Sequence, residues 1–179
     1  MNKDKLEFVS AIITNNEGKV LLLKRRNDLV LDAGKYDLCS RHMKECEVPM
    51  QTIYREMYEE LGIKQEEITK VQKIADIPTP HKKLKGTICH MYHVEIDLTQ
   101  KEINQRLKKI KEPEIESAQY IENIGMLRKI QKYTNLMRTE HTDEQDRIFE
   151  IMQEKQNKKE EIRVYKEQGK ESKLCQEER

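Results

Sequence analysis

Three glutamates, Glu56, Glu59 and Glu60, occur three and four residues apart within residues 49–61. On a helix this spacing places the three side chains on one face, because positions i, i+3 and i+4 are neighbours there. Like charges this close repel each other, so a stable arrangement requires positive charge nearby. Arg55 supplies one such charge, and a hard divalent cation such as Mg²⁺, which prefers oxygen ligands, would neutralise the rest. The pattern therefore predicts a metal site made of carboxylates.

Residues 49–61 also carry an apolar stripe that is separate from the glutamates. Its members recur at the spacing of one helix face and are Met50, Ile53, Tyr54, Met57 and Leu61. Pro49 favours a first helical turn, and Gly62 suits the position after the last turn, where a positive φ is wanted. We expect a helix over 49–61 that packs through this stripe and presents its carboxylates on the other face.

The spacing of these residues resembles the signature of the Nudix hydrolase family, G-x5-E-x7-R-E-U-x-E-E-x-G-U, where U is aliphatic. The match starts at Glu47, eight residues before Arg55, and continues through Gly62 and Ile63. Eight of the nine fixed positions agree. The exception is the leading glycine, where this chain has Arg41, and a side chain there could crowd the turn that shapes the metal loop.

The similarity to Nudix domains extends over residues 6 to 135. The segments that resemble elements of that fold are the strand-like runs 8–13 and 20–25 with a turn signal at 15–18 between them, the segment 34–38, the late strand 115–121 and the closing helix 124–130. The resemblance implies an α/β protein, a Nudix-type α/β/α sandwich with a central mixed β-sheet. Between these segments, 71–77 and 87–96 are strand-like, and 99–110 has a helical stripe that Thr99 can cap.

The resemblance also implies a reaction, the hydrolysis of a nucleoside diphosphate linked to another moiety with Mg²⁺ or Mn²⁺. It makes Glu56, Glu59 and Glu60 the metal ligands and Glu56, Arg55 and Glu59 the catalytic residues. Glu56 is a candidate base, and Arg55 would orient the glutamates through ion pairs. Glu47 would fix the loop or join the outer metal shell.

Substrate contacts are expected from basic or titratable side chains outside the helix. The candidates are Arg25, His42 in the segment before the helix, and Lys82 in the basic loop 78–86. In Nudix proteins a further ligand or the true base often comes from a later loop. The acidic candidates in this chain are Glu112, Glu114 and Glu116, which the sequence does not rank.

Two other classes of function compete with the hydrolase. Isopentenyl-diphosphate isomerases are similar, but they place a reactive cysteine just before a Gly-His pair. This chain has Ser40 two residues before His42, with Cys39 one position off. The second alternative is a catalytically silent Nudix module that binds a nucleotide, for which Arg41 is the best support and the intact glutamates are the counterargument.

Composition sets the wider expectations. Residues 1–138 are predicted to form the Nudix domain and 139–179 a highly charged helical extension. A net charge of +1 gives no general attraction to DNA or to an anionic membrane, and no apolar run is long enough for a transmembrane helix. The four scattered cysteines favour reduced thiols in a cytoplasmic protein. The expected partners are a small nucleotide diphosphate substrate and, in a homodimer, a second copy of the chain.

Overall fold

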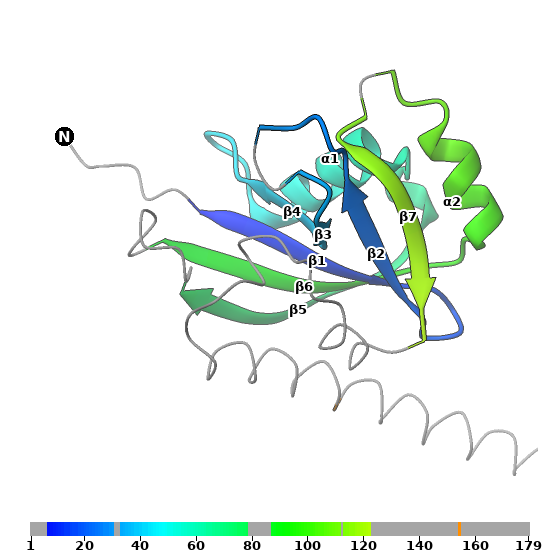
Figure 1. The fold of residues 1–179 in the computed structure, drawn as a ribbon. Helices are drawn as coiled ribbons and strands as arrows, with labels where there is room; N and C mark the ends of the chain where they lie inside the picture. Colours follow the sequence, from blue (N-terminus) through cyan, green and yellow to red (C-terminus); the bar gives the residue numbers. More distant parts are fainter. Residues whose placement is uncertain (1–6, 31–32, 79–86, 112, 123–153, 155–179) are drawn as a thin grey trace, which may run out of the picture.

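The computed structural model describes residues 7–30, 33–78, 87–111, 113–122 and 154. The strands are β1 (Phe8–Thr14), β2 (Val20–Arg25), β3 (Tyr36–Asp37), β4 (Cys39–His42), β5 (Ile68–Pro78), β6 (Ile88–Ile96) and β7 (Ile115–Ile121). The helices are α1 (Pro49–Leu61) and α2 (Gln100–Leu107), with a 3₁₀ turn at Gln65–Glu67. Figure 1 shows one twisted sheet with α1 behind it and α2 beside β7.

The seven strands form a mixed sheet in the order β3-β2-β1-β6-β5, with β4 also paired to β1 and β7 to β2. Strands β1 and β6 are parallel, and the other pairs are antiparallel. Strand β2 pairs with β1 only where Thr14 faces Val20, and it then turns away to pair with β7 along its length. The mixed sheet with flanking helices confirms the fold expected from the sequence.

Both faces of the sheet bury apolar side chains, because β1 and β2 are apolar at almost every position. One core cluster lies between the sheet and the helices and includes Val9, Ala11, Ile13, Leu21, Leu23, Ile53, Met57, Leu61, Val94, Ile96 and Ile103. The second cluster contains Ile12, Val20, Leu22, Leu38, Cys89, Met91 and Ile121. Helix α1 is thus fixed to the sheet by a large apolar contact.

Helix α1 has the bounds that the sequence predicts. It starts at Pro49, and the Val48 backbone N–H donates to Gln51 Oε1 at 3.0 Å. Ile53, Met57 and Leu61 are fully buried, and Met50 packs against the same core while partly exposed, so four members of the apolar stripe are confirmed. Tyr54, the fifth, is partly buried and belongs to neither core cluster. The helix ends at Gly62, whose φ of 65° is left-handed and whose N–H donates to Tyr58 O at 2.9 Å.

Replacing Gly62 by alanine is expected to destabilise the fold by about 1–2 kcal/mol, because a left-handed φ costs a residue with a Cβ about that much. A Cβ at this position would meet only the Arg106 Cβ, at the ordinary contact distance of 3.6 Å. The cost therefore comes from the backbone, and Gly62→Asn should lose less, since asparagine tolerates this conformation. Chemical denaturation of both variants measures the difference. Equal losses would contradict a conformational cause.

Helix α2 is capped and attached to the sheet by side-chain hydrogen bonds. Thr99 accepts from the Glu102 backbone N–H at its N-terminus, which confirms the predicted cap. The Gln100 side chain then bonds to the backbone of β7, donating to Ala118 O at 2.7 Å and accepting from Tyr120 N–H at 2.8 Å. These two bonds lie on the side of β7 that faces away from β2.

The structure departs from the expected elements at several places, among them α2, which ends at Leu107 whereas the helical stripe runs to residue 110. Strand β5 starts three residues earlier than the predicted run 71–77, and residues 39–42, expected to belong to a loop, form β4 against β1. The segments 79–86 and 123–153, which include Lys82 and the expected closing helix, lie outside the described residues, as do 155–179 of the extension. No helix in the described part of the chain is both long enough and apolar enough to span a bilayer.

Candidate active site

The loop before α1 is held by Glu47. Its carboxylate accepts two hydrogen bonds from Arg55, from Nε at 2.6 Å and from Nη2 at 2.8 Å. It also accepts from the Lys44 backbone N–H at 2.9 Å and from Thr52 Oγ1 at 2.8 Å. Hydrogen bonding to Arg55 lowers the pKa of Glu47 to about 2. Glu47 therefore ties the loop to the helix, and its role in support of a metal site stays a prediction.

Arg55 links Glu47 to the glutamates of the helix. Its Nη1 donates to Glu56 Oε1 and, at 3.2 Å, to Glu59 Oε2. The guanidinium is only 18% exposed, so it is held in place by ion pairs on both sides. Arg55 thus contacts Glu47, Glu56 and Glu59 at once, and its role in orienting the glutamates for catalysis stays a prediction.

The three glutamates of α1 have different surroundings. Glu56 and Glu60 are buried, with 4% and 6% of their surface exposed, whereas half of the Glu59 side chain is exposed. The sequence suggested that all three share one face. At 100° per residue, however, Glu60 lies only about 80° from the centre of the apolar stripe and Glu59 about 180° from it. The side chains of Glu56 and Glu60 therefore lie between α1 and the sheet, and the side chain of Glu59 points away from the core.

Arg41, at the position of the missing signature glycine, contacts both buried glutamates. It lies in β4, opposite Val9 of β1, and its side chain reaches α1. Its Nε donates to Glu56 Oε2 at 3.1 Å, and its Nη2 lies 3.3 Å from Glu60 Oε1. The same Nη2 lies 2.5 Å from Glu114 Oε2, just before β7. Three carboxylates thus converge on one guanidinium.

The backbone at Arg41 is an ordinary extended strand, which corrects the expectation that a side chain here could crowd a turn. Among the described residues, Cys46 is the one residue other than glycine with a positive φ, at 66°. The sharp turn of the loop is therefore displaced from Arg41, and the position accepts a large side chain without backbone strain.

Burial dominates the electrostatics of the two inner glutamates. It raises the pKa of Glu60 to about 8 and also raises that of Glu56, even though Arg41 and Arg55 favour their charged forms. The Oε2 atom of Glu60 is buried and accepts no hydrogen bond from the residues that the structure describes. A carboxylate oxygen in this state lacks a donor or a cation.

The donor atoms fit a hard divalent cation. Such a cation prefers carboxylate oxygens, and Glu60 Oε2 is an oxygen without a partner beside the Glu56 carboxylate. Within the described ranges, however, no three His, Cys, Asp or Glu side chains are already spaced as a metal site. Arg41 lies among the inner carboxylates, and Glu59 is turned toward Arg55. The carboxylate oxygens that a metal ion would need are present, and the guanidinium of Arg41 lies between them.

Of the three expected substrate residues, Arg25 lies near this cluster, whereas the His42 ring lies on the other face of β4, against Phe8. Arg25 ends β2 and places Nη2 3.4 Å from Glu114 Oε2, the carboxylate that also contacts Arg41. His42 follows Arg41, and its ring lies against Phe8 with 3.8 Å between centroids. Burial and the charge of Arg41 lower the pKa of His42, so the ring is neutral near pH 7. Lys82 lies outside the described residues.

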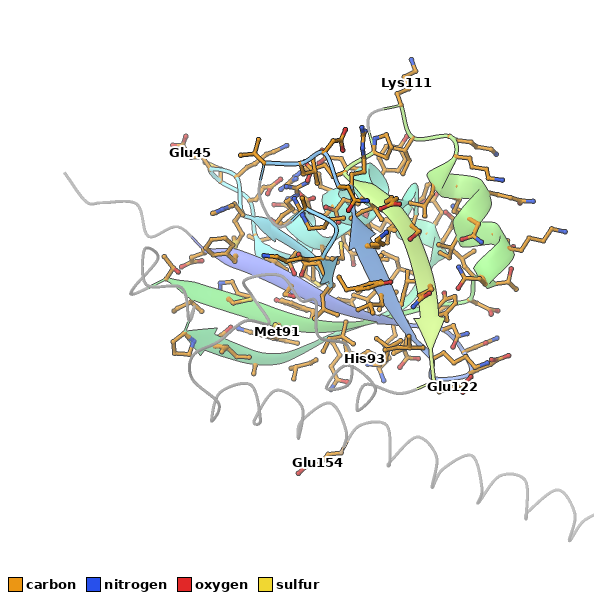
Figure 2. The ribbon with its side chains drawn as sticks, in the orientation of Figure 1. Glu45, Met91, His93, Lys111, Glu122 and Glu154 are labelled. Atoms are coloured by element: carbon orange, nitrogen blue, oxygen red, sulfur yellow. The ribbon has the colours of Figure 1, made fainter. Side chains whose placement is uncertain are left out.

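Of the acidic candidates before and within β7, the structure brings Glu114 to the site. Glu116 instead pairs with Lys24 at 2.9 Å, and residue 112 lies outside the described ranges. Figure 2 shows the two ends of this part of the chain: Lys111 precedes β7 at the end near α1, and Glu122 follows it at the opposite end. One sequence signal could have identified Arg41. It is a positive residue at the glycine position of the signature, and the glutamates of the same signature carry the opposite charge.

A Nudix domain model matches residues 6–133 of the sequence. That range covers most of the chain, and this protein therefore belongs to the Nudix family. The resemblance noted from the signature is confirmed. None of the curated proteins is significantly similar to the chain in sequence.

Solved Nudix structures share the fold at low identity. The NUDIX domain of NrtR from Shewanella oneidensis, complexed with ADP ribose, is 14% identical with a TM-score of 0.58, over 86% of this chain and 89% of that one. A NUDIX hydrolase from Nitrosomonas europaea is 15% identical with a TM-score of 0.57, over 81% and 86%. The MutT protein of Methanosarcina mazei Go1 is 19% identical with a TM-score of 0.54, over 76% and 90%.

Proposed function

We propose that this protein hydrolyses the diphosphate linkage of a nucleoside diphosphate derivative in a reaction that depends on Mg²⁺ or Mn²⁺. The observation that carries the proposal is the pair of buried carboxylates, Glu56 and Glu60, on one side of α1, with one Glu60 oxygen free of any donor among the described residues. Burying two carboxylates in the same place is costly unless a cation compensates them. Arg55, which Glu47 holds, also contacts Glu56, and the spacing of these residues in the sequence matches the Nudix signature.

In this proposal Glu56, Glu59 and Glu60 would hold the cation, and two of them have a neighbour that orients them. Arg55 fixes the orientation of Glu56 and Glu59, and Glu47 fixes Arg55. The cation, when bound, withdraws charge from the bridging phosphates and makes a water molecule more acidic. Glu56, whose pKa burial raises, is the candidate base that accepts the proton from that water.

The proposed substrate class is a nucleotide diphosphate, and its contacts are proposed for Arg25 and His42. A guanidinium at the end of β2 suits a phosphate oxygen, and the neutral ring of His42 offers a donor or an acceptor. The NrtR domain, which shares the fold, was solved with ADP ribose. Compounds of that kind therefore belong among the first substrates to try.

A second candidate is a nucleotide-binding module without catalysis, and Arg41 favours it. The Arg41 guanidinium already contacts Glu56 and Glu60, so these glutamates have a counter-charge in the absence of a metal. An isomerase is less well supported. The thiol of Cys39 is buried, and burial followed by the charge of Glu60 raises its pKa well above the ordinary value. Such a thiol is not a reactive thiolate near pH 7.

We expect turnover on at least one diphosphate compound to require a divalent cation. The substrates are nucleotide sugars, ADP ribose, dinucleoside polyphosphates, (d)NTPs and isopentenyl diphosphate, assayed with Mg²⁺, with Mn²⁺ and with EDTA. Products are identified by chromatography, and binding is measured by calorimetry on the same set. Hydrolysis that EDTA stops and Mg²⁺ restores supports the hydrolase. Tight binding of a nucleotide without turnover under any metal condition would support the silent module.

A further inference from the structure

We propose that Arg41 is a built-in counter-ion that occupies the cation position between Glu56 and Glu60, and that a divalent metal ion binds there only by displacing it. The inference rests on the proposed function, because it concerns the same metal site. It adds a competitor that is part of the chain.

The contacts of Arg41 place its charge among the proposed ligands. Its guanidinium contacts Glu56 Oε2 through Nε at 3.1 Å and Glu60 Oε1 through Nη2 at 3.3 Å. Both carboxylates are about 5% exposed in their side chains, so solvent compensates them poorly, and Arg41 is the one cation that contacts both of them among the described residues. Arg55 is the other cation here, but it is held by Glu47 on its far side.

Arg41 also has a second partner, Glu114, to which it can stay bound when it leaves the two buried glutamates. Its closest contact, 2.5 Å, is with Glu114, which does not belong to α1 and whose side chain is 38% exposed. The Arg41 side chain itself is 30% exposed, so it has a route out of the cluster. It can leave Glu56 and Glu60 while keeping its bond to Glu114. The displaced charge therefore does not have to be buried without a partner.

Competition for one position has a measurable consequence. In the native chain the free energy of metal binding is reduced by the cost of removing Arg41 from the two carboxylates. Arg41→Gly, which restores the signature residue, and Arg41→Gln, which keeps a side chain without the charge, both remove that cost. Each variant should bind Mg²⁺ more tightly by about tenfold or more, since charge-assisted pairs have to be broken only in the native protein.

The first measurement is Mg²⁺ titration by calorimetry, with Mn²⁺ binding followed by electron paramagnetic resonance. The control is Arg106→Gln, which removes an arginine of similar exposure that pairs with Glu67 at 2.5 Å and contacts neither Glu56 nor Glu60 in the ion pairs of the described residues. Its metal affinity should equal that of the native protein. Tighter binding in the Arg41 variants alone supports the inference. Equal or weaker binding in those variants overturns it and leaves the hydrolase proposal standing, whereas no metal binding in any protein overturns both.

The second measurement is thermal stability with and without metal. Without metal, Arg41→Gln should melt below the native protein, because the buried Glu56 and Glu60 lose the guanidinium that contacts both of them. With saturating Mg²⁺ the gap should shrink or reverse, because the metal ion supplies that charge in both proteins. A purely structural ion pair would leave the same gap under both conditions. Arg106→Gln should show the same difference in melting temperature from the native protein with and without Mg²⁺.

A third measurement needs only the native chain and applies even if the Arg41 variants fail to fold. In ¹⁵N-labelled protein, the Nε–Hε signal of Arg41 reports its hydrogen bond to Glu56. Adding Mg²⁺ should move this signal toward that of a solvent-exposed arginine, while the Arg106 signal stays in place. An Arg41 signal that does not respond to Mg²⁺ at concentrations that saturate the calorimetric site would overturn displacement.

Discussion

Replacing Glu60 by glutamine is expected to reduce kcat/KM for metal-dependent diphosphate hydrolysis by about 10²–10⁴-fold, because the cation site loses a buried charged ligand. Glutamine keeps the size and the helix propensity of glutamate, so the fold should survive. Stability without metal should hold or rise, since burial disfavours the charged form of Glu60 and the substitution removes that charge. Turnover, Mg²⁺ affinity and melting temperature are measured on the same protein.

The matched control for Glu60→Gln is Glu66→Gln in the 3₁₀ turn after α1, where the side chain is exposed. It makes the same chemical change outside the cluster and should alter neither turnover nor affinity. Glu59→Gln is the informative companion, because Glu59 is exposed and bonded to Arg55. A loss of activity in Glu59→Gln as large as in Glu60→Gln would support a joint metal site. Native turnover in both variants would end the assignment of these residues.

Truncating Leu61 to alanine is expected to destabilise the protein by about 2–5 kcal/mol, the range for removing a fully buried leucine. Leu61 is 0% exposed and belongs to the core between α1 and the sheet. Val30→Ala is the surface control, because Val30 is 99% exposed and should change stability by less than about 0.5 kcal/mol. Urea denaturation gives both values. A small loss at Leu61 would mean that the core relaxes around the missing atoms.

The elements nearest the site were predictable because their signals are local. Helix α1 follows from an apolar stripe, a proline at its start and a glycine at its end, and its predicted bounds are the observed ones. Strands β2 and β7 likewise have the predicted bounds. Strand β4 was missed because Cys39–His42 has neither alternation nor a β-branched residue. Its conformation depends on pairing with β1, which is a contact between distant parts of the chain.

The composition of the site was predictable, but its internal geometry was not. Motif spacing identified Glu47, Arg55 and the glutamates of α1, and the structure places all of them in one network. Motif spacing did not predict that Glu56 is buried, because its burial depends on the packing of β4 beside the helix. The ranking of Glu114 above its acidic neighbours also depends on tertiary structure, since Arg41 and Arg25 reach it from two other strands.

The bonds between Gln100 and β7 occupy backbone groups on the side of the strand that faces away from β2. Within the described residues β7 pairs with β2 alone, so its other side would offer unpaired amide and carbonyl groups to any extended chain. The Gln100 side chain occupies the Ala118 carbonyl and the Tyr120 amide as a neighbouring strand would. A single amide side chain thus closes the middle of an exposed sheet edge. Its loss would open a template for intermolecular strand addition and aggregation while leaving the glutamate cluster of α1 untouched.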